Sequence, residues 1–177
     1  MNISIPRRVL VAGVTVVVGA VLPTVSAISA DTGALRARAT IIDATGNQVG
    51  FAHFTEDAAG GVHINVKVAD LSPGLHGLHV HGVGICESPA FTSAGSHFNP
   101  SGASHGGHAG DLPNLVVNDA GRGTLNTHID GFTLSAGATS LFDVDGSAIV
   151  IHANPDDFTP PTGNSGGRVA CGVLTAS

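Results

Sequence analysis

Tryptophan and tyrosine are absent from this chain of 177 residues, and phenylalanine occurs only 7 times. With 25 glycines and 9 prolines, this composition favours short strands joined by tight turns over long helices. Basic side chains are also scarce, since 7 lysines and arginines face 13 aspartates and glutamates, and the formal net charge is −6. Two of the basic ones, Arg7 and Arg8, lie near the N-terminus, so the rest of the chain is more acidic still. Such a surface argues against nucleic acid as a partner.

Residues 1–30 have the pattern of a secretory signal peptide. Arg7 and Arg8 supply the positive start, and an apolar stretch follows over residues 9–22. This stretch is shorter than the roughly 18 residues that a spanning helix needs, which disfavours the alternative of an uncleaved membrane anchor. The two arginines leave both general and twin-arginine export open.

Small residues near the end of this segment predict cleavage after Ala27 or Ala30. We therefore expect a single mature domain over residues 31–177, a size that buries roughly two thirds of its unfolded surface. The mature protein is predicted to be secreted or extracytoplasmic, in the cell envelope or periplasm, with no membrane association after cleavage of the leader.

The chain has only two cysteines, Cys86 and Cys171. In an oxidising compartment we expect them to form a disulfide, which would close a long loop between two distant parts of the chain. The alternative is a pair of buried free thiols. In the chain-entropy model a loop of this length contributes about 4 to 5 kcal/mol.

Alternating hydrophobicity, which marks strands with one buried face, recurs along the mature sequence. In residues 62–68 every second side chain is apolar, whereas residues 84–113 lose the alternation and are rich in Gly, Ser, Pro and Asn. We predict an all-β fold, an antiparallel barrel or sandwich. Eight strands are expected: 34–42, 49–55, 62–68, the strand that contains His79 and His81, 115–117, 123–129, 147–151 and 168–174.

A short glycine-rich segment holds four potential metal ligands: His97, His105, His108 and Asp111. Three imidazoles and one carboxylate match a tetrahedral zinc site. Two glycines separate His105 from His108, so the backbone can bend until both rings reach one ion. The alternative is a solvent-exposed loop that happens to be rich in histidine.

His79 and His81 lie two positions apart on a predicted strand and therefore point to the same face. His152 lies much later in the chain. Three neutral imidazoles without carboxylate or thiolate suit copper and leave room for a substrate. His97 can complete this set if its ring loses both protons and bridges the two metals. The other isolated histidines are predicted to be ordinary surface or core residues: His53, His63 and His128.

Four segments resemble the copper/zinc superoxide dismutases of the exported bacterial kind: 74–81, 92–100, 108–114 and 163–172. The resemblance extends from about residue 34 to the C-terminus. It implies an eight-stranded antiparallel Greek-key barrel or sandwich with two long metal-binding loops. It implies copper and zinc as cofactors and superoxide as the substrate.

The resemblance also implies a role for individual residues. It places copper on His79, His81, His97 and His152, and zinc on His97, His105, His108 and Asp111. It pairs Cys86 with Cys171 and makes His76 a structural histidine near the copper strand. It makes Asp156 the carboxylate that links a copper histidine to a zinc histidine.

The implied reaction is the disproportionation of superoxide to oxygen and hydrogen peroxide by one-electron cycling of copper, with zinc as a structural neighbour. Arg168 would hold the anion, because a guanidinium is permanently charged, and His97 would carry a proton. The spacing of His105 and His108 is shorter than in the best-known members, so a copper-only superoxide dismutase is one alternative. An exported metal-binding protein without turnover is another. Relatives pair through different barrel faces, and the sequence leaves a homodimer open.

Overall fold

The computed structural model describes residues 1–2 and 34–177. Its elements are β1 (Arg36–Asp43), β2 (Gln48–Glu56), β3 (Val62–Val68), β4 (Gly74–His76), β5 (Leu78–His81), the 3-10 helix η1 (Thr92–Ala94), β6 (Leu115–Val117), β7 (Gly123–Ile129), β8 (Ala148–His152), β9 (Arg168–Val173) and β10 (Thr175–Ala176). No helix in this part of the chain has the length and apolar character needed to span a membrane. The predicted cleavage sites and the apolar stretch of the leader lie outside the described residues.

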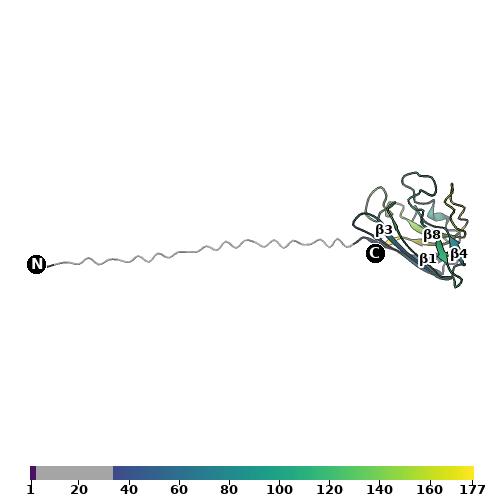
Figure 1. The fold of residues 1–177 in the computed structure, drawn as a ribbon, viewed down its shortest axis with the longest axis horizontal. Helices are drawn as coiled ribbons and strands as arrows, with labels where there is room; N and C mark the ends of the chain where they lie inside the picture. The colour runs from purple at the N-terminus through teal and green to yellow at the C-terminus, as the bar shows by residue number, and fades with distance from the viewer. Residues whose placement is uncertain (3–33) are drawn as a thin grey trace. The chain divides into compact units, whose positions relative to one another are not determined.

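The strands form one antiparallel sheet in the order β4-β6-β7-β3-β2-β1-β9-β8-β5, with β10 beside β1. β4 and β5 stand at opposite ends of this order, yet only Gly77 separates them in the chain. The sheet therefore curls until its ends meet, which gives the nearly closed barrel in Figure 1. The connections from β3 to β4 and from β7 to β8 skip neighbouring strands, as in Greek-key folds. The predicted all-β barrel is confirmed.

The structure divides one predicted strand into two. β4 pairs with β6, whereas β5 pairs with β8. The change of partner falls at Gly77, whose N–H donates to the carbonyl of Asn154 (2.8 Å). The short β10, which was not predicted, pairs with β1 and accounts for the other additional strand.

Alternate side chains of the strands fill the barrel. In β3, Val62, Ile64 and Val66 are buried while the residues between them face outward. β5 and β8 differ, because every residue of both strands is buried. Leu78 and Val80 of β5 belong to the main core, so the side chains between them lie on the outer face, beneath the loops.

A second, smaller hydrophobic cluster lies on the outer side of β8. It contains Phe91, Ala148, Val150 and Cys171, with Cys86 packed against it. The predicted disulfide between Cys86 and Cys171 is present (S–S 2.01 Å). The disulfide and the buried Phe91 ring together attach the long loop after β5 to β9.

Candidate metal centre

Two segments of the long loop pair with the free edge of β5. The isolated bridges are His79 with Asp111 and His81 with His97. Between them, the N–H of Val80 donates to the carbonyl of Gly110 (2.9 Å). A side chain at Gly110 would collide with the Val80 carbonyl, so this close approach requires glycine. The pairing brings residues that are distant in sequence alongside the two strand histidines.

Four imidazoles gather on the outer face of β5 and β8, with one ring nitrogen of each within 4.8 Å of the others: His79, His81, His97 and His152. Nε2 of His81 and Nε2 of His152 are 3.5 Å apart. The other nitrogen of each of these two rings donates to a backbone carbonyl: Nδ1 of His81 to Gly95 (2.9 Å) and Nδ1 of His152 to Gly166 (3.2 Å). The donation fixes the tautomer and leaves Nε2 of both rings free as a ligand.

In His79 the roles of the two ring nitrogens are exchanged, so that Nδ1 is the free one. Its Nε2 lies 2.7 Å from Oδ2 of Asp156, and its Nδ1 is buried without any hydrogen-bond partner. A buried nitrogen without a partner costs free energy unless something else satisfies it. A copper ion held by this all-imidazole set would satisfy it, so the residues present fit the metal.

Burial keeps these imidazoles neutral. It lowers the pKa of His81 to about 2 and that of His152 to about 4, and the charges of Arg168 and His97 add to the effect. Burial, with the charge of His97, lowers the pKa of His79 to about 3. Metal ligation requires unprotonated nitrogens, so at neutral pH these three rings are ready to bind.

The second cluster consists of three imidazoles and one carboxylate: His97, His105, His108 and Asp111. Oδ1 of Asp111 lies 2.9 Å from Nδ1 of His97 and 3.3 Å from Nδ1 of both His105 and His108. In a tetrahedral zinc site with bonds of about 2.0 to 2.1 Å, neighbouring ligand atoms are about 3.3 Å apart. The four residues therefore fit zinc.

The short spacing between His105 and His108 does not keep the two rings apart. Their Nδ1 atoms are 3.5 Å from each other. Gly106 adopts a positive φ of 84°, which turns the chain sharply, and its N–H donates to Oδ2 of Asp111 (2.8 Å). Burial alone would raise the pKa of Asp111, but hydrogen bonds from His97 and Gly106 and the nearby histidines lower it to about 2. This carboxylate is therefore ionised at neutral pH.

Asp156 lies between the two clusters. Its Oδ2 accepts from Nε2 of His79 (2.7 Å), and its Oδ1 lies 2.9 Å from Nε2 of His105. Asn114 holds the backbone of Asp156 through two hydrogen bonds, of 2.7 and 2.8 Å. No pattern in the sequence indicated this role of Asn114. The predicted structural histidine, His76, contacts the carbonyl of His152 through Nδ1 (2.7 Å).

Arg168 lines the entrance to the first cluster. A cavity of about 600 Å³ is bounded by Arg168 and by His81, His97 and His152. The guanidinium donates to the carbonyls of Phe91 and Gly95, the latter at 2.6 Å. Because the Gly95 carbonyl also accepts from His81, one backbone group positions both the cation and a ligand. Burial lowers the pKa of Arg168 below its ordinary value, yet a guanidinium remains charged.

Strand register decides which of the remaining histidines are neighbours. His53 pairs with Asn65, and His63 lies directly opposite His128. His63 and His128 are exposed, but they are not isolated. Together with Asp57 they form a third group of potential metal ligands.

Comparison with known proteins agrees with this architecture. Residues 48–174 match the family described as copper/zinc superoxide dismutase. The chain is 40% identical over 149 residues to copper–zinc superoxide dismutase 2 of Aquifex aeolicus, covering 79% of this chain and 86% of that protein. It is 39% identical over 166 residues to the copper–zinc superoxide dismutase of Deinococcus radiodurans, covering 83% and 88%. The crystal structure of a superoxide-dismutase-like protein from Bacillus subtilis superposes with a TM-score of 0.74 at 37% identity, covering 78% and 97%.

An antiparallel barrel whose outer face carries two histidine-rich clusters with one shared imidazole is the framework of a two-metal protein. The chain belongs to the copper/zinc superoxide dismutase family. Membership makes it an oxidoreductase, a superoxide dismutase, with copper and zinc as its metals.

Proposed function

We propose that the chain disproportionates superoxide, with copper on His79, His81, His97 and His152, and zinc on His97, His105, His108 and Asp111. The observation that carries the proposal is the membership of His97 in both clusters. Bound copper would supply one-electron redox chemistry, and zinc would hold the shared ring in place. Two superoxide anions and two protons give one oxygen and one hydrogen peroxide.

The orientation of His97 gives it a second role. Nδ1 of His97 faces the second cluster, 2.9 Å from Oδ1 of Asp111 and 3.3 Å from Nδ1 of His108. Its Nε2 is therefore the nitrogen available to the first cluster and to the cavity. We assign to Nε2 the holding and delivery of one of the two protons that the peroxide product needs.

Arg168 supplies the positive charge that attracts and orients the anion. Two backbone carbonyls hold the guanidinium in one place, and the cavity connects it with the first cluster. A fixed cation at the mouth of a cavity raises the local concentration of an anionic substrate. A metal-storage protein would not need this feature, so Arg168 favours turnover over metal binding alone.

Purified protein loaded with both metals tests the proposal through its metal content and its rate of superoxide disproportionation. We expect these two clusters to hold one copper and one zinc per chain, and we expect cyanide to block the activity. Arg168→Ala should lower the rate roughly tenfold or more at unchanged metal content, whereas the exposed Arg122→Ala should leave it unchanged.

Three results would each contradict a part of the assignment. Full metal loading without turnover would make the chain a copper- and zinc-binding protein. An Arg168→Ala variant as fast as the wild type would remove the anion-binding role. Activity with copper alone and no zinc bound would instead identify a copper-only enzyme.

We also propose that the mature protein acts outside the cytoplasm. The disulfide between Cys86 and Cys171 supports this location, because such bonds persist in oxidising compartments. Export, cleavage after Ala27 or Ala30 and assembly into a homodimer stay predictions. Mass determination of the secreted protein would test the cleavage site.

A further inference from the structure

We propose that Asp57, His63 and His128 form a third transition-metal site, on the outer face of β3 and β7. The ligand is a divalent ion of the zinc and copper kind, held by two imidazoles and one carboxylate. The three side chains each offer one donor atom, all within 4.8 Å of one another. Imidazole-rich sites of this composition suit zinc and copper better than magnesium or calcium.

The donor atoms already have the spacing that such an ion needs. Oδ2 of Asp57 lies 2.9 Å from Nε2 of His128 and 3.6 Å from Nε2 of His63. These distances bracket the edge of about 3.3 Å expected for tetrahedral coordination with bonds of about 2.0 to 2.1 Å. The two rings lie directly across the β3–β7 pairing, with centroids 4.5 Å apart. Rigid strands therefore hold both imidazoles.

The turn between β2 and β3 orients the carboxylate. Oδ1 of Asp57 accepts hydrogen bonds from the backbone N–H groups of Ala59 (2.8 Å) and Gly61 (3.2 Å). This leaves Oδ2 directed at the histidines. A Cβ at Gly61 would collide with the His128 ring, so the glycine makes room for that ring beside the turn.

A second carboxylate, that of Asp130, lies beside the imidazole of His128. Oδ1 of Asp130 lies 3.6 Å from Nδ1 of His128. Without a metal, Nε2 of His128 donates to Oδ2 of Asp57 (2.9 Å). A metal ion on Nε2 would displace this proton, and the charge of Asp130 favours a proton on Nδ1 instead.

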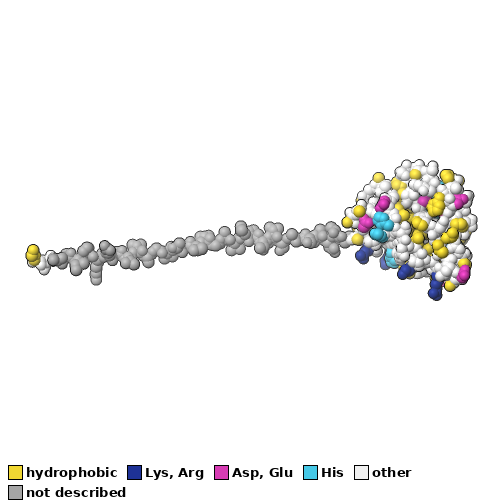
Figure 2. Space-filling view, viewed as in Figure 1, with side chains coloured by type: hydrophobic (Ala, Val, Ile, Leu, Met, Phe, Trp, Pro, Cys, Tyr) yellow, Lys and Arg dark blue, Asp and Glu magenta, His cyan; other side chains and the backbone are white. Residues whose placement is uncertain are grey.

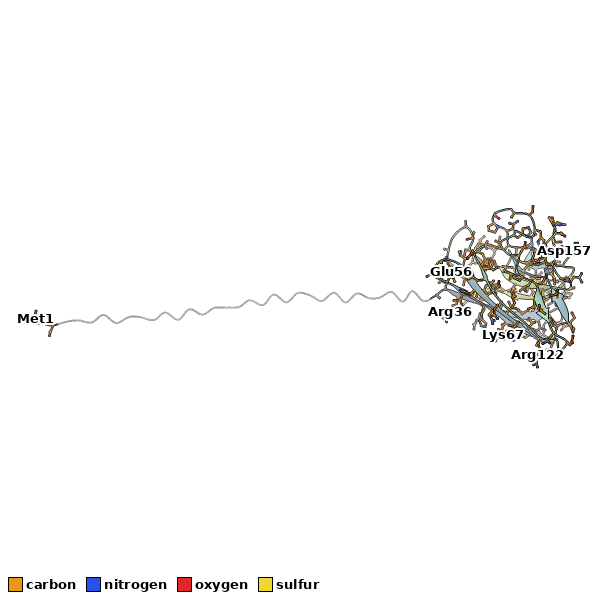
Figure 3. All side chains as sticks on the ribbon, in the orientation of Figure 1. Met1, Arg36, Glu56, Lys67, Arg122 and Asp157 are labelled. Carbon is orange, nitrogen blue, oxygen red and sulfur yellow. A yellow bond between two sulfur atoms is a disulfide. The ribbon has the colours of Figure 1, made fainter. Side chains whose placement is uncertain are left out.

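The site is separate from the copper and zinc clusters. In the strand order, β2, β1 and β9 lie between β3 and the pair β8 and β5. Figure 3 labels Glu56, the neighbour of Asp57, and Asp157, the neighbour of Asp156, at well separated places on the domain. Histidine and acidic side chains adjoin on the surface over β3 in Figure 2. The side chains of His63 and His128 are 64% and 38% exposed, so an ion can enter from solvent and keep open positions for water.

Equilibrium dialysis of the copper- and zinc-loaded protein against Zn²⁺ tests the proposal. We expect the wild type to take up one zinc more per chain than the His63→Ala/His128→Ala double variant at the same free zinc concentration. Asp57→Asn keeps an acceptor for the turn but loses the charge, and it should weaken the extra zinc at least roughly tenfold. His53→Ala removes another exposed histidine of the same face and should bind as the wild type does.

Two outcomes would overturn the third site. One is equal zinc uptake by the wild type and the double variant, in which case the side chains form only a surface ion pair. The other is an equal loss in His53→Ala, which would indicate unspecific binding by exposed imidazoles. Nuclear magnetic resonance of the protein with its copper reduced and its disulfide intact provides a second measurement. Added zinc should shift the ring signals of His63 and His128 and leave those of His53 unchanged. The comparison does not depend on superoxide chemistry, so it stands or fails apart from the proposed reaction.

Discussion

Removal of the disulfide should weaken both the fold and the active centre. We consider the Cys86→Ala/Cys171→Ala double variant, which leaves no unpaired thiol. The two cysteines have a sequence separation of 85. For a loop of that length the chain-entropy model predicts a loss of about 4.5 kcal/mol in the free energy of unfolding. At about 2 to 4 °C per kcal/mol for a domain of this size, the melting temperature should fall by roughly 10 to 20 °C.

The functional effect follows from where the disulfide attaches the loop. The loop after Cys86 carries the carbonyls of Phe91 and Gly95, which hold the guanidinium of Arg168. A loop released from β9 should let this cation move away from the cavity. We therefore expect a lower rate of superoxide disproportionation per bound copper.

Denaturant unfolding of the metal-free proteins measures the change in the free energy of unfolding without a contribution from bound metal. Wild-type protein treated with a thiol reductant is the matched control and should lose a similar free energy. A double variant within about 1 kcal/mol of the oxidised wild type would refute the entropic reasoning. An unchanged rate per copper would refute the link between the loop and Arg168.

Two further changes test single carboxylates. Asp156→Asn cannot accept from both His79 and His105, and it should weaken metal binding roughly 10- to 100-fold in chelator competition; unaltered affinities would show that the link does not orient the ligands. Glu56 is buried and accepts from the N–H and hydroxyl of Ser135 (2.6 and 2.7 Å); burial would raise its pKa, but these hydrogen bonds lower it below the ordinary value. Its stabilising effect is therefore present above the unfolded pKa of about 4.5 and lost as the pH falls through the folded pKa. The Glu56→Gln variant should have a free energy of unfolding about 1.5 to 3 kcal/mol lower than the wild type at pH 7, and it should lose less stability than the wild type as the pH falls. Parallel curves of stability against pH for the two proteins would contradict this.

Local patterns were enough to predict much of the barrel. Hydrophobic alternation has a period of two in a strand, so the strands and the shared face of His79 and His81 could be inferred without knowing what packs against them. The cluster around His105 and His108 could be predicted for a related reason. Its ligands lie close together in the chain, and the glycines between them permit the turn.

Contacts between distant segments required the tertiary structure. The division of a strand at Gly77 depends on which strand lies beside it, and alternation carries no information about partners. The burial that lowers the pKa of His81 comes from loops elsewhere in the chain.

The sequence by itself determined the period-two strands, the scarcity of cations and the kinds of donor available for metals. Only the tertiary structure brought together donors that lie outside the segments that carry the family resemblance. His63 and His128 are distant in the sequence and become neighbours through the register of β3 against β7. Register is set by the packing of the whole sheet, since a slip by a single position would turn every side chain to the opposite face.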